Sequence, residues 1–219
     1  MKAFIPVVIA AGLCLGGCKT PIIPGSTNIE PPTKGIYVGG LYKPIGGSRR
    51  GSAPVNLIRI CTVSTTLSEF GVPAPEGNAI ADIDLLATRT LSASVSGLNV
   101  AVAKAGLSGT ISDYYEYKIV NASSYELGLA DASTVFAKLM KKADCRTQVA
   151  EELAGGSVVQ VTKAYVGDIV FRRKTGASLS GELSAPAVQA ALSRETDLRF
   201  KGNGMVFAFV GKTKTGTGY

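Results

Sequence analysis

Residues 131–172 read DASTVFAKLMKKADCRTQVAEELAGGSVVQVTKAYVGDIVFR, and in this stretch a helical pattern changes into a strand pattern. Apolar residues recur at three- and four-residue spacings between Val135 and Ala143, which is typical of an amphipathic helix. We therefore predict a helix over Asp131–Leu153, ended by Gly155-Gly156, or two helices with a break near Asp144. Strands are predicted to follow at Val158–Val161 and Tyr165–Arg172.

Strand patterns also dominate the rest of the chain. A second, shorter helix is predicted at Ala185–Ser193, and a closing hairpin joins Leu198–Phe200 to Met205–Val210 across Gly202-Asn203-Gly204. Apolar residues alternate with polar ones over much of 80–120, and further strand candidates lie at Ile36–Tyr42 and Val55–Val63. These elements predict an α+β fold, a strand-rich and mainly antiparallel sheet with one long and one short helix. They form a single domain over 36–211, before a polar tail at 212–219.

Composition limits the chemistry that the chain can perform. It is 46% hydrophobic, which fits a packed core, and it contains neither His nor Trp. Without His, catalysis by a Ser-His-Asp or Cys-His arrangement is excluded. No cofactor motif, zinc cluster or CxxC pair occurs, so no cofactor or metal is predicted.

The first residues have the pattern of an export signal. Lys2 precedes an apolar run, Ala3–Leu15, that is too short to span a membrane as a helix. The run ends in Leu15-Gly16-Gly17-Cys18, which resembles the lipobox of bacterial lipoproteins. The resemblance covers residues 1–18 only and identifies no domain family. It implies cleavage before Cys18 and attachment of lipid to its thiol, whereas an ordinary cleaved signal peptide is the alternative.

Lys19 follows the cysteine where inner-membrane lipoproteins often have Asp, so the resemblance favours the outer membrane. The next residues, to Gly35, include four prolines and no apolar periodicity. We predict that 18–35 form an extended tether, which would reach roughly 50 Å if fully polyproline-like. Such a tether would hold the domain clear of the lipid headgroups.

Removal of the signal and lipidation account for Cys14 and Cys18, which leaves Cys61 and Cys145. In an oxidising compartment these two are expected to form a disulfide between an early strand and the main helix. Its chain-entropy stabilisation would be about 4–5 kcal/mol. The alternative is a pair of buried free thiols.

The formal charge is +7, or near +6 without the signal segment, and the basic residues are scattered in small groups. They are interpreted as a solvated surface, with attraction to anionic headgroups or acidic envelope polymers as the alternative. No basic stripe interleaved with aromatic residues indicates nucleic acid. Lys-Thr-Gly at 174–176 and at 214–216 resembles a motif of penicillin-binding proteins, but the SxxK nucleophile of those enzymes is missing.

Three further patterns are candidates for function. Strand alternation in DYYEY (113–117) leaves Tyr114 and Glu116 exposed as possible partner contacts. Asp82 and Asp84 would share one strand face, and Glu151-Glu152 end a helix; such pairs are interpreted as surface unless two carboxylates meet in a cleft. The alternation over Leu91–Ile119 is typical of folded sheet and also of a membrane-inserting hairpin.

We therefore expect a lipid-anchored envelope lipoprotein, on the periplasmic or surface face of the outer membrane. Its role would be non-catalytic: binding a protein or polymer partner, or supporting an assembly. A carboxylate-dependent hydrolase of envelope polymers and a pore-forming component are the alternatives.

Overall fold

The structure is a computed structural model that describes residues 21–46, 55–61, 63–64, 66–85, 103, 115–173 and 202–215. In chain order the elements are β1 (Thr27–Thr33), β2 (Leu41–Gly46), β3 (Val55–Cys61), the 3-10 turn η1 (Ser68–Phe70), β4 (Gly77–Ala79), β5 (Ile83–Asp84), β6 (Tyr115–Glu126), α3 (Leu129–Leu139), α4 (Ala143–Gly155), β7 (Ser157–Arg173) and β8 (Gly202–Thr215).

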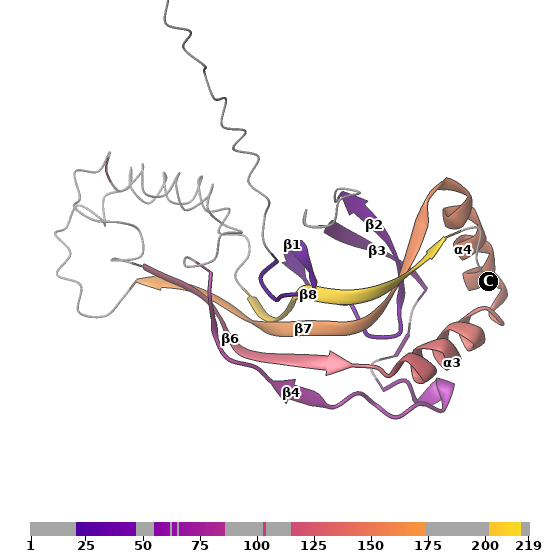
Figure 1. Cartoon of the computed structure of the whole chain (residues 1–219), viewed down its shortest axis with the longest axis horizontal. Coiled ribbons are helices and arrows are strands. Elements are labelled where there is room, and N and C mark those ends of the chain that lie inside the picture. The colour runs from indigo at the N-terminus through magenta and orange to yellow at the C-terminus, as the bar shows by residue number, and fades with distance from the viewer. Residues whose placement is uncertain are drawn as a thin grey trace, which may run out of the picture.

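The strands form one sheet in the order β2-β3-β1-β8-β7-β6-β4, with β5 also paired to β6. All pairs are antiparallel except β1 with β3. Because β2 pairs with β7 as well as with β3, the strands β2, β3, β1, β8 and β7 close into a ring. Figure 1 shows β1, β2 and β3 on one side of the long strands β7 and β8, with α3 and α4 at one end. The predicted α+β class with a mainly antiparallel sheet is confirmed.

Strand β7 contributes to two hydrophobic cores. Val161 and Ala164 belong to the larger core, which includes the buried faces of α3 and α4. Tyr165 and Ile169 belong to the smaller core, together with Ile119 of β6 and residues of β8. Both faces of β7 are therefore covered over part of its length, and apolar residues of the strand pack into both cores.

The predicted helix over Asp131–Leu153 is two helices, α3 and α4. The chain turns between them at residues 140–142. There the amide of Lys141 donates to the carbonyl of Lys138, and the amide of Lys142 donates to the carbonyl of Leu139. In α3 the residues Val135 and Leu139 are buried, at the predicted spacing, and Ala132 is buried one turn earlier, whereas Ala143 at the start of α4 is exposed. The predicted helix at Ala185–Ser193 lies outside the described residues.

The predicted disulfide is present between Cys61, at the end of β3, and Cys145, in the first turn of α4, with a Cα–Cα distance of 5.5 Å. Both residues are buried in the larger core. The bridge fixes one wall of the ring to the helical layer.

The predicted tether is wrong over much of its length. Residues 27–33 form β1, in which Ile29 pairs with Val55 and Asn28 pairs with Ala208. Ile29 is only 2% exposed, so this segment belongs to the core of the domain. The register shifts between Asn28 and Thr33, and this irregularity accommodates prolines that cannot donate to a strand ladder.

Two boundaries near the C-terminus also differ from the prediction. The polar tail expected at 212–219 is strand as far as Thr215, since Lys212 and Lys214 pair with residues of β7. The hairpin turn expected at residues 202–204 is the irregular beginning of β8, where Gly202 pairs with Ile169. Gly204 has a φ of +61°, so its backbone conformation favours glycine. The predicted strand Leu198–Phe200 lies outside the described residues.

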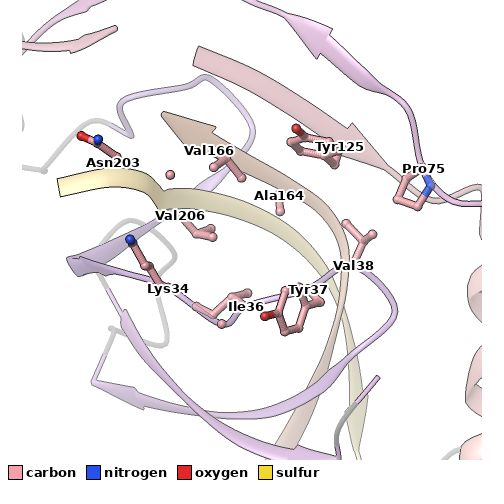
Figure 2. Close-up of a pocket in the computed structure, with 12 residues that line it drawn as sticks. Lys34, Ile36, Tyr37, Val38, Pro75, Tyr125, Ala164, Val166, Asn203 and Val206 are labelled. Carbon is pink, nitrogen blue, oxygen red and sulfur yellow. The ribbon is translucent and has the colours of Figure 1, made fainter. Parts of the chain in front are cut away.

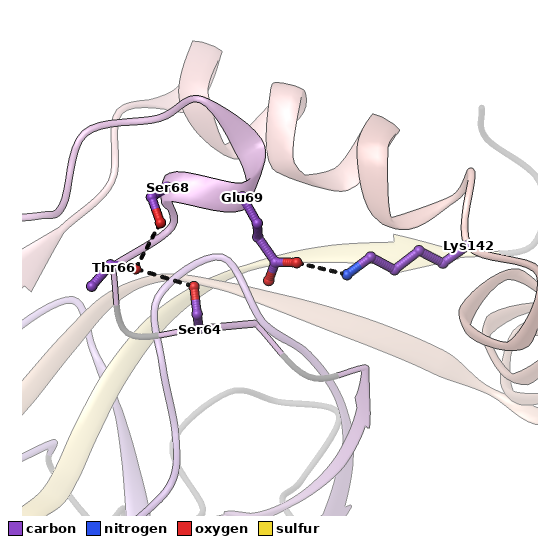
Figure 3. A network of polar contacts seen from close by, with 5 residues as sticks. All are labelled: Ser64, Thr66, Ser68, Glu69 and Lys142. Atoms are coloured by element: carbon purple, nitrogen blue, oxygen red, sulfur yellow. Dashed lines mark hydrogen bonds and ion pairs between the residues drawn. The ribbon is translucent and has the colours of Figure 1, made fainter.

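Lysines near the end of α3 hold the turn η1 against the helices. Lys138 donates a hydrogen bond to the carbonyl of Phe70 at 2.6 Å, and Lys142 lies 3.0 Å from a carboxylate oxygen of Glu69. Figure 3 shows this ion pair beside a chain of hydroxyl contacts joining Ser64, Thr66 and Ser68. The hydrogen bond from Lys142 lowers the pKa of Glu69 below its ordinary value.

Candidate functional site

A cavity of about 490 Å³ opens between residues 34–38 and the sheet. Figure 2 shows Ile36, Tyr37 and Val38 along one side of it, facing Ala164, Val166 and Val206 of the sheet. Lys34 and Asn203 lie toward one end, and Pro75 and Tyr125 toward the other. The complete lining is Lys34, Gly35, Ile36, Tyr37, Val38, Pro75, Tyr125, Ala164, Val166, Asn203, Gly204 and Val206.

The wall formed by residues 36–38 is held to β7 by two hydrogen bonds between the adjoining Gly39-Gly40 pair and Val161. The amide of Gly39 donates to the carbonyl of Val161 at 2.7 Å, and the amide of Val161 donates to the carbonyl of Gly40 at 3.1 Å. The amide of Tyr37 donates to the hydroxyl of Tyr42 at 2.8 Å. A Cβ on Gly40 would lie 2.8 Å from the Tyr42 ring, so glycine leaves room for it.

Burial raises the pKa of the Tyr42 hydroxyl above its ordinary value. The neutral hydroxyl therefore remains an acceptor for the Tyr37 amide and a donor to the Tyr37 carbonyl, 3.5 Å away. The wall is thus fixed by one buried side chain in addition to the backbone bonds.

The opposite wall is built from three neighbouring strands. Tyr125 of β6 packs its ring over Gly77 of β4, where a Cβ would lie 3.0 Å from the ring. Ala164 and Val166 come from β7, and Val206 comes from β8 opposite Val166. The register of the sheet therefore sets the shape of this wall.

Asp168 of β7 lies outside the lining and holds Gly204, a lining residue at the polar end of the cavity. Its carboxylate accepts one hydrogen bond from the side-chain amide of Asn121, at 2.9 Å, and one from the backbone amide of Gly204, at 2.8 Å. Asn121 has a φ of +51°, so both partners stand at positive-φ positions in the strands beside β7. These two hydrogen bonds, and to a smaller extent the charge of Lys34, lower the pKa of Asp168.

A second cavity, of about 610 Å³, is lined by Ile23, Ile80, Ala81, Asp82, Ile83, Asp84, Ser124, Lys163 and Tyr165. Asp82 and Asp84 therefore contribute to one hollow, although only Asp84 belongs to a strand, the two-residue β5. The ammonium of Lys163 lies 2.7 Å from Glu126 and 5.6 Å from the centre of the Tyr165 ring. Its pKa is raised by the hydrogen bond to Glu126.

The other predicted site residues are distributed as follows. Leu15, Gly16, Gly17 and Cys18 lie outside the described residues, as does Tyr114. Glu116 was expected at the surface, but its side chain is only 15% exposed and pairs with Lys118 at 3.2 Å. The predicted exposure of Glu116 is therefore wrong, because its carboxylate lies against the ammonium of Lys118 in the same strand. Glu152 pairs with Lys43 at 2.6 Å.

Two predicted motifs fall partly or wholly beyond these residues. The first Lys-Thr-Gly begins at Lys174, outside them, and the second begins within β8 at Lys214. The alternating run over Leu91–Ile119 is described from 115 onward, apart from residue 103, and there it forms the first part of β6. Ile119 is fully buried in the smaller core.

The first cavity was missed by sequence reasoning. Lys34 was assigned to the tether and Ile36–Tyr42 to a strand, while Asn203 was assigned to a turn. The Gly39-Gly40 pair, which interrupts an apolar run, is the one local signal of the irregular backbone at residues 36–40.

None of the helices in the described part of the chain is long and apolar enough to cross a membrane. The described residues also contain no group of three or more His, Cys, Asp or Glu side chains placed to hold a metal ion. Comparison of the chain with protein-family models, with curated proteins and with solved structures finds no match.

Proposed function

We propose that this chain is a lipid-anchored lipoprotein of the bacterial cell envelope whose folded domain has a non-catalytic binding role. The observation that carries the proposal is the Cys61–Cys145 disulfide, since such bridges persist in oxidising compartments and are rare in the cytosol. The Leu15–Cys18 sequence, which resembles a lipobox, supplies an export route and an anchor. Two acyl chains hold a protein at a membrane far longer than one.

A binding role is supported by the composition of the first cavity. Its walls are formed mostly by apolar side chains, with a few polar groups toward one end, as in small-molecule binding sites. The membrane is one partner, through the lipid. A protein or envelope polymer is proposed as the other, and no nucleic acid is expected.

Substitution of the acylated cysteine tests the anchor. Cells producing the chain with Cys18→Ser are expected to release it from the membrane fraction, with loss of the acyl mass from the purified protein. Cys14→Ser is the matched control, because it removes a neighbouring thiol from the segment expected to be cleaved. Continued membrane fractionation of the Cys18→Ser form, with unchanged mass, would refute the anchor. Crosslinking in intact cells followed by pull-down identifies the partner.

A carboxylate-dependent hydrolase of envelope polymers is the second candidate, and a specific observation favours it. Asp82 and Asp84 line the same cavity, and the hydrolase hypothesis requires two carboxylates that meet in one cleft. Release of reducing ends from envelope polysaccharide by the wild-type protein, abolished by Asp82→Asn or Asp84→Asn, would support it. Turnover that survives both substitutions, or no turnover at all, would exclude these carboxylates as its catalytic pair.

A further inference from the structure

We propose that the cavity between residues 34–38 and the sheet binds a small amphipathic anion, with its apolar chain inside and its acidic head at Lys34. This inference rests on the proposed binding role of the folded domain and not on the lipid anchor. The shared chemistry is an unbranched apolar chain joined to a carboxylate or phosphate, as in a free fatty acid or a membrane phospholipid.

The dimensions and walls of the cavity fit the apolar chain. Its volume, about 490 Å³, lies within the roughly 300–1,000 Å³ of small-molecule sites. Ile36, Val38 and Val206 are each less than a tenth exposed, and they form walls on both sides. Such walls offer an apolar chain burial without leaving polar groups unsatisfied.

The charge at the other end fits an acidic head. Lys34 is exposed, and none of the ion pairs between described residues includes it. The carboxylate of Asp168, whose pKa the charge of Lys34 helps to lower, has Asn121 and Gly204 as its hydrogen-bond donors and is not ion-paired with Lys34. The Lys34 ammonium is thus available for a bound anion, and the side-chain amide of Asn203 at the same end is a further donor.

The tyrosines of the lining give a second reason for an amphipathic ligand. The hydroxyls of Tyr37 and Tyr125 make no hydrogen bond to another described residue, whereas the backbone amide of Tyr37 is bonded to Tyr42. Both residues are partly exposed, and their rings lie at the lining of the cavity. Tyrosine rings suit the boundary between an apolar interior and water.

The test uses the full chain carrying Cys18→Ser, so that failure of the anchor does not affect the result. Calorimetric titration with decanoate is expected to show saturable binding with one site per chain. Octanoate should bind about fifteen-fold more weakly, because each buried methylene accounts for about fourfold. Decan-1-ol, which has the same chain length without the charge, should bind about fivefold more weakly than decanoate.

Two pairs of variants distinguish recognition of the ligand's acidic head from recognition of its apolar tail. Lys34→Glu is expected to weaken decanoate about fivefold or more and to leave decan-1-ol unchanged, while Lys141→Glu, an exposed site outside the lining, changes neither. Val166→Phe fills the cavity and should abolish binding of both ligands. Val170→Phe, the same change on the same strand outside the lining, should preserve it.

A second measurement, of protein association with phosphatidylglycerol vesicles, distinguishes a free amphiphile from a membrane lipid as the ligand. Decanoate binding without vesicle association assigns the site to free amphiphiles, and Lys34-dependent vesicle association assigns it to membrane lipid; both support the proposal. Absence of saturable binding in both arms by protein that is folded by circular dichroism would overturn it. Equal effects of Lys34→Glu and Lys141→Glu would overturn it too. Neither result bears on membrane fractionation of the wild-type chain.

Discussion

Breaking the Cys61–Cys145 disulfide is expected to lower the free energy of unfolding by about 4–5 kcal/mol. The bridge joins residues separated by 84 positions. A crosslink that closes a loop of this length removes about 15 cal/mol/K of entropy from the unfolded chain, which is about 4.6 kcal/mol at 25 °C. That loss is a large share of the roughly 5–15 kcal/mol by which domains are stable.

Urea unfolding followed by far-ultraviolet circular dichroism measures this difference. The oxidised protein is compared with the same protein after reduction and with the double variant Cys61→Ala, Cys145→Ala. Alanine avoids placing a hydroxyl in the larger core, where both residues are buried. Reduction breaks the crosslink without changing the residues. Comparing the reduced protein with the alanine variant therefore distinguishes the stability lost with the crosslink from the stability lost with side-chain packing.

The midpoint should fall in both arms, and the dependence of the free energy on urea should steepen as the unfolded chain expands. Peptide mapping of unreduced, denatured protein should find no free thiol at either position. A difference below about 1 kcal/mol between oxidised and reduced protein would refute the loop-entropy reasoning. Two reactive thiols would refute the bridge itself.

Three further perturbations follow from the described contacts. In the fold the pKa of Asp168 is lowered from 3.8, so its ionised carboxylate stabilises the folded state above pH 3.8. This contribution to the free energy of unfolding is lost as the pH falls below that value. Asp168→Asn should therefore make the free energy of unfolding, measured by urea unfolding at a series of pH values, depend less steeply on pH in the acid range. Gly167→Ala places a Cβ against the fully buried Ile119 and should cost about 1–3 kcal/mol in thermal unfolding, whereas Gly155→Ala meets nothing within 4 Å and should be neutral or stabilising. Lys142→Ala removes an exposed ion pair and should cost less than about 1 kcal/mol in urea unfolding, with the cost shrinking in high salt.

Local patterns in the sequence were sufficient to predict the helices and most described strands. The spacing of Val135 and Leu139 identified the buried face of α3, because helical periodicity is a property of neighbouring residues. The break at residues 140–142 differs little from the alternative near Asp144. The cysteine pair was predictable because two of the four cysteines were accounted for by the resemblance to a lipobox.

Strand β1 and the first cavity could not be predicted in this way. The prolines of residues 27–33 are typical of a linker, and their segment is a strand only because β3 and β8 supply partners on both sides. The cavity combines Lys34, Tyr125 and Val206, which are far apart in sequence and meet only through the register of three strands. A local sequence pattern does not show which distant residues the strand register brings together.

Closure of the ring by the pairing of β2 with β7 has a consequence for self-association. Open strand edges offer unpaired amides and carbonyls to other chains, and long exposed edges template aggregation. Here β2 has partners on both sides at Leu41 and Tyr42, and the outer side of β6 carries β4 and β5, which are three and two residues long. Among the described strands, the outermost elements at that border are thus too short to recruit a neighbouring molecule's strand. A concentrated sample should consequently resist edge-to-edge polymerisation as long as the β2–β7 contact remains intact.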